Sequence, residues 1–171
     1  IFAKALNSRY SSYYDNANTI VEIYNIDNKS NPNLVMNYEL EEPYYTSRCI
    51  NNTLYVISSG NLREENNKIS RRYTENNVEK EIALKNIKYL KDVETYKQSL
   101  ISVVDLDNLN KDIDVTSYLI DISNAYVSEN SIYLLDQNYE YNDSEPEIRN
   151  LFGLKGVIGL FDYDDDYSSS Y

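Results

Sequence analysis

A short motif recurs three times along the chain and limits the folds that it can adopt. It consists of two apolar residues, Asp or Asn, an apolar or aromatic residue, and Asp. The copies are Ile23-Tyr24-Asn25-Ile26-Asp27, Val103-Val104-Asp105-Leu106-Asp107 and Leu160-Phe161-Asp162-Tyr163-Asp164. Each copy is typical of a β-strand that runs into a turn. A chain with such repeats builds its fold from similar units that stack on their neighbours.

A second repeated signature accompanies the first. Asn52-Thr53-Leu54-Tyr55-Val56-Ile57 is similar to Asn130-Ser131-Ile132-Tyr133-Leu134-Leu135, and both are a polar turn followed by a β-branched and aromatic run. Asp27 and Asp107 are eighty residues apart, so the first two copies of the repeat align in register over their first half, whereas the second half, from Tyr55 to Tyr133, slips by two residues. Asn52 and Asn130 are therefore expected to mark hairpin turns.

These patterns predict β-strands with two long connections among them. The expected strands are 19–26, 34–40, 45–50, 53–59, 100–106, 114–120, 125–128, 131–136 and 157–163. The long connections are residues 60–99 and 138–156, and each falls between the first and second strand of a unit. Because corresponding corners of repeated units lie on the same rim, both insertions are expected on one face. The first holds either a short helix or an extra extended piece.

Repeated units of four antiparallel strands predict an all-β fold of β-propeller blades, about two to three of them in an incomplete propeller. A β-sandwich is the alternative. The whole chain, 1–171, is interpreted as one propeller fragment. Its expected parts are 18–59 (last three strands of one blade and first strand of the next), 60–99 (inserted loop), 100–137 (rest of that blade and first strand of the third), 138–156 (second loop) and 157–171 (second strand of the third blade and tail).

Three stretches together resemble a known family. They are "VEIYNIDNKSNPNLVMNYELEEPYYTSRCINNTLYVIS", "SLISVVDLDNL" and "AYVSENSIYLLDQNY", which span Val21 to about Tyr139. The Ser-Arg pair before the "LYV" run, the "SNP" turn and the "AYVSENSIYLL" hairpin are similar to secreted bacterial β-propeller proteins that are distant relatives of WD-40 repeats. The resemblance implies an exported or surface-displayed propeller without an assigned reaction. It therefore supplies no catalytic residues, and the upstream blades of the full pattern are missing here.

The charge of the chain limits its partners. Sixteen Lys and Arg against 28 Asp and Glu give a formal net charge of −12, which repels phosphate backbones and anionic lipid surfaces. No apolar run is long enough to insert into a membrane, and this chain contains no signal-peptide pattern. The expected partner is a protein or a cell-wall carbohydrate, contacted through the long loops. Unpaired blade edges would also favour a homo-oligomer.

The absence of histidine excludes several kinds of chemistry. Ser-His-Asp and Cys-His catalysis cannot be built within this chain. Cys49 has no second cysteine with which to pair, and Ser47-Arg48-Cys49 is interpreted as part of an outer blade strand before a hairpin turn. Arg48 is expected to clamp a carboxylate or to cap carbonyls between blades. Asp27, Tyr55 and Tyr133 are the other residues expected to have structural roles.

Acidic residues raise two further hypotheses. Asp105 and Asp107 in one turn, and Asp162 and Asp164 in another, offer the oxygen ligands that Ca²⁺ prefers, although turn formation by the same side chains is the alternative. No other cofactor is expected. Glycoside hydrolysis needs only two suitably separated carboxylates, so a carbohydrate-active or other hydrolytic domain is the alternative function. Nineteen tyrosines favour either a stacking surface or the codon usage of an AT-rich genome.

Overall fold

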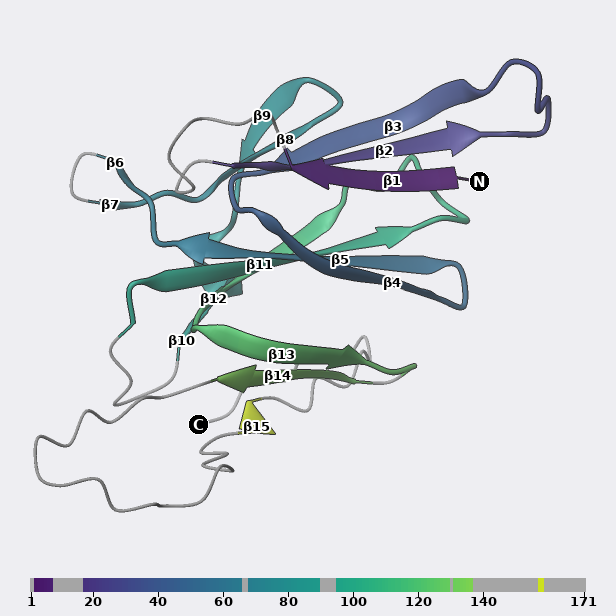
Figure 1. Cartoon of the computed structure of the whole chain (residues 1–171). Helices are drawn as coiled ribbons and strands as arrows, with labels where there is room; N and C mark the ends of the chain where they lie inside the picture. Colours follow the sequence, from purple (N-terminus) through teal and green to yellow (C-terminus); the bar gives the residue numbers. More distant parts are fainter. Residues whose placement is uncertain are drawn as a thin grey trace, which may run out of the picture. The chain divides into compact units, whose positions relative to one another are not determined.

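The computed structural model describes residues 2–7, 17–65, 68–89, 95–129, 131–136 and 157–158 (Figure 1). Its elements are β-strands and one short 3-10 turn, η1 (Leu84–Asn86). Within these residues no helix is long and apolar enough to cross a membrane. The chain divides into two compact units, residues 1–121 and residues 122–171, and each is described by itself.

Sheet A is the first of two five-stranded sheets in the unit of residues 1–121. Its strands, in spatial order, are β1 (Phe2–Asn7), β2 (Thr19–Asn25), β3 (Asn33–Leu40), β8 (Arg72–Glu75) and β9 (Val78–Glu81). All neighbours are antiparallel. In β2 and β3 every second side chain is buried, as expected for a sheet with one face on a core.

Sheet B is the second five-stranded sheet of this unit. Its spatial order is β10 (Ile87–Tyr89), β12 (Asp114–Leu119), β11 (Lys97–Asp105), β5 (Thr53–Asn61) and β4 (Tyr44–Ile50). The strands β4, β5, β11 and β12 form an antiparallel meander, and β10 joins β12 in parallel. Asn51 and Asn52 connect β4 to β5 with φ of 47° and 60°, the left-handed conformation that a two-residue hairpin turn requires and Asn tolerates.

The core of this unit lies between sheets A and B. The buried apolar side chains that form it are Val21, Ile23, Met36, Tyr38, Leu40, Leu54, Val56, Ile82, Leu100, Val104, Ile113 and Val115. The Tyr38 hydroxyl lies 2.9 Å from Ser102 Oγ, which joins β3 to β11 across the core. Burial raises the pKa of Tyr38, so this hydroxyl remains neutral and its polar group is satisfied within the core.

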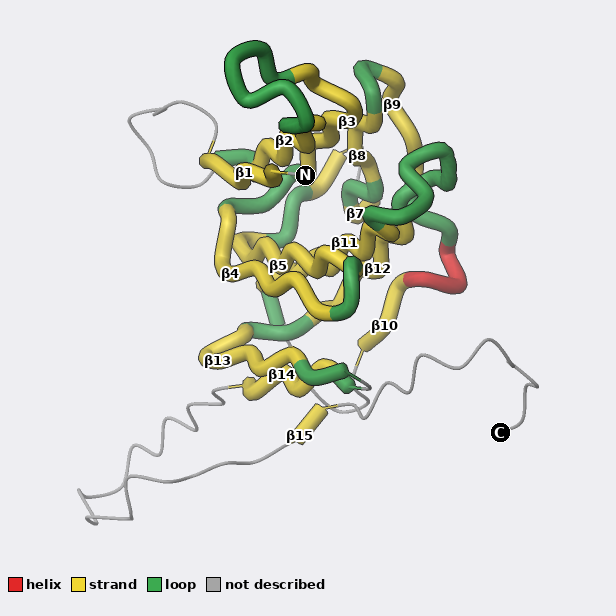
Figure 2. Tube along the Cα trace, turned by 90° about the vertical axis from the view of Figure 1, so that its right-hand side faces the viewer, coloured by secondary structure: helices red, strands yellow, loops and turns green. Residues whose placement is uncertain are grey.

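The segment between β5 and β11 connects the two sheets a second time (Figure 2). It first forms the small β6 (Glu64–Glu65) and β7 (Lys68–Ile69) pair, then adds β8 and β9 to sheet A. After η1 it returns and adds β10 to sheet B. We call this segment, from β6 to β10, the strap. The chain thus leaves sheet B after β5, adds two strands to one edge of sheet A, and returns to sheet B at the edge opposite β4.

The structure confirms the all-β, antiparallel fold class and modifies two expectations. Within the described part of residues 60–99 the insertion consists mostly of short strands, the extended one of the two expected alternatives. Phe2–Asn7 adds a strand that the sequence patterns did not indicate. The expected grouping of strands into blades placed β4 in one blade with β2 and β3, but in the structure β4 lies beside β5. The two-residue Asn51-Asn52 turn leaves no room for β4 to join another sheet, and β8 occupies the position beside β3.

The unit of residues 122–171 contains a three-stranded sheet. The strands β13 (Ile122–Val127) and β14 (Ile132–Asp136) form a hairpin, and β15 (Val157–Ile158) pairs with β14. β13 therefore pairs with β14, whereas the expected grouping of strands made it the last strand of the preceding blade. The expected second loop, 138–156, lies outside the described residues, so a rim shared by both insertions stays a prediction.

The strap is expected to contribute to stability through its buried Ile82. This side chain is 2% exposed and packs in the core, whereas Leu84, two residues later, is 72% exposed. Ile82→Ala should lower the free energy of unfolding by about 2–4 kcal/mol, because it leaves a cavity between the sheets. Leu84→Ala is the matched control and should change it by less than about 0.5 kcal/mol. Urea unfolding followed by circular dichroism measures both; equal effects would contradict a strap that is anchored in the core.

Candidate functional site

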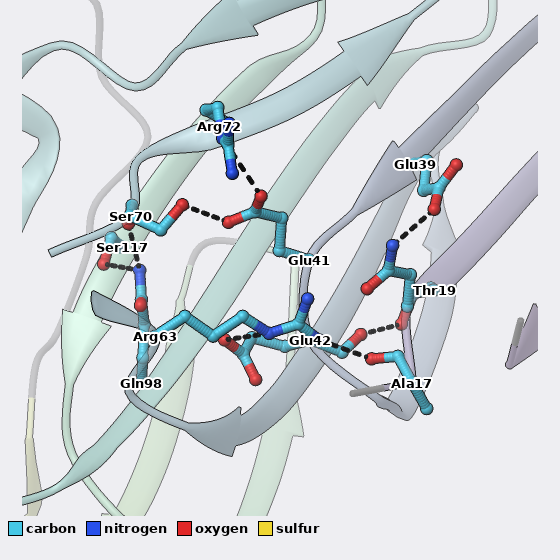
Figure 3. A network of polar contacts seen from close by, with 11 residues as sticks. Ala17, Thr19, Glu39, Glu41, Glu42, Arg63, Ser70, Arg72, Gln98 and Ser117 are labelled. Carbon is cyan, nitrogen blue, oxygen red and sulfur yellow. Dashed lines mark hydrogen bonds and ion pairs between the residues drawn. The ribbon is translucent and has the colours of Figure 1, made fainter. Parts of the chain in front are cut away.

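A network of polar side chains surrounds the connection between β3 and β4, where the chain passes from sheet A to sheet B (Figure 3). Glu41 and Glu42 lie in this connection, directly before Pro43. Thr19 Oγ1 of β2 donates to the Glu42 carbonyl oxygen at 2.7 Å, which fixes the backbone. The Glu42 side chain is only 2% exposed, so a carboxyl group is enclosed at this end of the inter-sheet space.

Arg63 and Gly60, both from the end of β5 and the residues after it, enclose the Glu42 carboxyl group. Arg63 Nε lies 3.8 Å from Glu42 Oε1, and Arg63 Nη2 donates to the Ala17 carbonyl oxygen at 2.9 Å. Among the described residues, Glu42 Oε2 has no hydrogen-bond partner. Gly60 is required here, because a Cβ atom would overlap Glu42 Oε2 and would lie 2.7 Å from Pro43 Cδ.

Burial changes the protonation of Glu42. Loss of hydration raises the pKa of its carboxyl group to about 8, against the opposing effect of the Arg63 guanidinium. The Glu41 carboxylate raises the pKa further, and the Lys97 ammonium lowers it. The carboxyl group is therefore mostly protonated at neutral pH.

Glu41 extends the network toward the strap and sheet B. It accepts a hydrogen bond from Ser70 Oγ, and its Oε1 lies 3.3 Å from Arg72 Nε. Gln98 Nε2 on β11 donates to Ser117 Oγ on β12 at 2.9 Å and lies 3.5 Å from the Ser70 carbonyl oxygen. The network therefore links the β3–β4 connection, the strap and two strands of sheet B.

Three exposed tyrosines lie at this same end of sheet B. Tyr45 is at the start of β4, Tyr89 is the last residue of β10, and Tyr96 directly precedes β11. The strand pairing places these three positions at one end, since Tyr44 faces Ser58, Lys97 faces Asn61 and Tyr89 faces Leu119. Tyr89 and Tyr96 are 74% and 85% exposed. We call Tyr45, Tyr89 and Tyr96 the tyrosine rim.

A family model for the β-propeller domain matches residues 2–162. The chain belongs to this β-propeller domain family. No curated protein and no solved structure matches it.

The expected Ca²⁺ ligands of this propeller domain form turns where the structure describes them. Asp105 Oδ1 accepts from the Asp107 backbone N–H at 2.9 Å, and Asn52 Nδ2 donates to Asp107 Oδ1 at 3.2 Å. Asp27 is held similarly, because its N–H donates to Asn25 Oδ1 at 2.8 Å. In the described part of the chain no group of three or more acidic or cysteine side chains is placed to hold a metal ion. Asp162 and Asp164 lie outside the described residues, so a Ca²⁺ site stays a prediction.

Ser47, Arg48 and Cys49 lie on β4, an edge strand of sheet B. Arg48 and the free Cys49 are both exposed, while Ser47 Oγ lies 3.0 Å from the Tyr44 hydroxyl. Arg48 Nη1 donates to the carbonyl oxygen of Ser47, its neighbour in the sequence, at 3.2 Å. This contact of Arg48 is local, and a clamp between blades stays a prediction.

Tyr55 and Tyr133, the other two residues expected to have structural roles, lie in different units of the propeller domain. Tyr55 is buried in the centre of sheet B, where it pairs in register with Arg48 and Val103. Tyr133 on β14 faces Tyr126 on β13, and their ring centroids are 6.0 Å apart. Both positions fit packing roles.

The sequence patterns missed the network around Glu42. Its members come from β2, the β3–β4 connection, the residues after β5, the strap, β11 and β12, and no spacing along the chain relates them. The signals present were the Glu41-Glu42-Pro43 sequence and Gly60, one of four glycines. Neither signal indicates a buried carboxyl group until the sheets are assembled.

Gly60→Ala tests the close contact between Gly60 and Glu42. We expect the free energy of unfolding to fall by about 2 kcal/mol, because the added methyl group overlaps Glu42 Oε2 and crowds Pro43. In a Glu42→Ala background the same substitution should cost less, since only the contact with Pro43 remains. A double-mutant cycle of urea unfolding measures the coupling, and strictly additive effects would show that the two groups do not touch.

Proposed function

We propose that this β-propeller domain is a non-enzymatic binding or scaffold module, exported or displayed at the cell surface, that holds its partner at the tyrosine rim. The observation that supports this proposal is the exposure of Tyr45, Tyr89 and Tyr96 at one end of sheet B. Tyrosines are enriched at binding surfaces, because each presents a large rigid ring with a polar end and loses little side-chain entropy.

The geometry of the rim suits an extended ligand. Tyr89 and Tyr45 belong to the two edge strands of sheet B, and Tyr96 precedes its central strand. With neighbouring strands ~4.8 Å apart, the rim crosses the sheet over ~19 Å. A linear glycan or a protein surface could span that length.

The partner is proposed to be a protein or a cell-wall carbohydrate. A formal net charge of −12 opposes binding to nucleic acid. It is compatible with neutral glycans and attracts basic protein surfaces. The strap itself is a less suitable contact than a free loop would be, because β8, β9 and β10 are committed to sheet pairing.

The hydrolytic alternative finds no support in the polar network. Glu41 and Glu42 are neighbouring carboxyl groups, but Glu42 is closed off by Gly60 and Arg63. A glycosidase needs two carboxyl groups on either side of an accessible glycosidic bond. We therefore assign no reaction to this site.

The proposal is tested by replacing the two most exposed tyrosines of the rim. The double variant Tyr89→Ala/Tyr96→Ala and the wild type are applied to a glycan array that includes peptidoglycan fragments, and to immobilised cell-surface proteins. We expect the binding signal of the wild type to fall at least about tenfold, because exposed tyrosines at contacts often contribute more than about 1 kcal/mol each.

Tyr126→Ala is the matched control. Tyr126 is 64% exposed but lies on β13, in the other unit of the chain. This variant should bind like the wild type, and circular dichroism should show all variants folded. Undiminished binding by the double variant, or an equal loss in the control, would contradict the tyrosine rim as the contact surface.

A further inference from the structure

The joint between sheets A and B contains a buried carboxyl group, that of Glu42, which lies near one guanidinium but is only loosely paired with it. Glu42 Oε2 has no hydrogen-bond partner among the described residues, and Glu42 Oε1 lies 3.8 Å from Arg63 Nε, longer than a hydrogen bond. Arg63 Nη2 donates to the Ala17 carbonyl oxygen, while the buried Arg63 Nε, which faces Glu42, has no hydrogen-bond partner among the described residues. A neutral carboxyl group fits this enclosure, whereas an ionised one would need hydration or a closer cation.

The backbone around Glu42 is closed by three hydrogen bonds between segments. The Ser59 N–H donates to the Pro43 carbonyl oxygen at 2.9 Å, and the Leu62 N–H donates to the Tyr96 carbonyl oxygen at 2.7 Å. The Ser70 N–H donates to the Arg63 carbonyl oxygen at 2.8 Å. These bonds tie β5 to the β3–β4 connection, and the residues after β5 to the strap and to the residue before β11. We expect a movement that exposes Glu42 to water to strain or break some of these bonds.

We propose that Glu42 is a pH-controlled latch: protonated, it keeps the β3–β4 connection and the start of the strap closed, and ionised, it lets this end of the inter-sheet joint open locally. The charged groups that face it are Glu41 from its own connection, Arg63 from the segment after β5, and Lys97 from β11. Thr19 and Ala17 contribute neutral contacts from the β2 side. The latch does not depend on the binding function proposed above.

The direction of the pH response follows from proton linkage. In a locally opened state the hydrated Glu42 would return to the ordinary pKa of a glutamate, about 4.3. Burial raises its pKa to about 8 in the closed state, so between these values the closed state holds one more proton than the open state. Raising the pH therefore favours opening, by about tenfold for each pH unit, and the effect ends above about pH 8.

Amide hydrogen exchange of the whole chain tests the latch. Exchange at Ser59, Leu62 and Ser70 is measured by NMR between pH 5.5 and 7.5 and corrected for the intrinsic effect of pH. The protection factors of these amides should fall about a hundredfold over this range. The Leu106 amide, which donates to the Asn52 carbonyl oxygen at the opposite end of sheet B, is the internal reference and should keep its protection.

Glu42→Gln supplies the matched variant, because it preserves shape and removes the titration. In this variant the protection of Ser59, Leu62 and Ser70 should no longer depend on pH. The latch is overturned if the variant and the wild type respond alike, or if Leu106 loses protection together with the other three amides, since that would be global destabilisation. If the variant does not fold, the wild type alone provides the test: a fall in protection with pH at Ser59 but not at Leu106 supports the latch, and an equal change at both amides contradicts it.

Discussion

The pairing of the strap with both sheets is the constraint on which the rest of this unit depends. The chain leaves sheet B after β5, supplies β8 and β9 to sheet A, and returns to sheet B as β10. The strap thus supplies edge strands to both sheets, and its Ile82 packs in their common core. The two sheets are therefore expected to fold and unfold as one cooperative unit rather than as separate blades.

The side chains buried between sheets A and B are apolar at one end of the sheets and polar at the other. Toward the Asn51-Asn52 turn the inter-sheet space contains Leu54, Val56 and Val104, which exclude water. Toward the strap it contains Ser58, Gln98 and the Glu42 carboxyl group, all buried. Buried polar groups are costly unless paired, so the polar end is where local opening should be easiest.

Most of the strands could be predicted from the sequence, but their grouping could not. Alternation and the Asn turns placed β2, β3, β5, β11 and β12 within a few residues of their observed bounds. The grouping failed because β8, with the sequence Arg72-Tyr73-Thr74-Glu75, has little apolar character, although it occupies the position beside β3. The network around Glu42 could not be predicted because it forms only when six separate segments meet. Tyr89 and Tyr96 stood out only as members of a tyrosine-rich composition.

The edges of the two sheets differ in how they are protected against pairing with other chains. β9 carries Glu79, Lys80 and Glu81, and β10 has only three residues, so both edges use devices that oppose intermolecular strand pairing. β4 has seven residues, and Arg48 is its single charged side chain. Neither a short length nor several charges protect β4 against pairing with another chain. In sheet B it pairs with β5 on one side only. If copies of this chain associate through a strand edge, as the sequence predicts, these differences make β4 the least protected of these three edges.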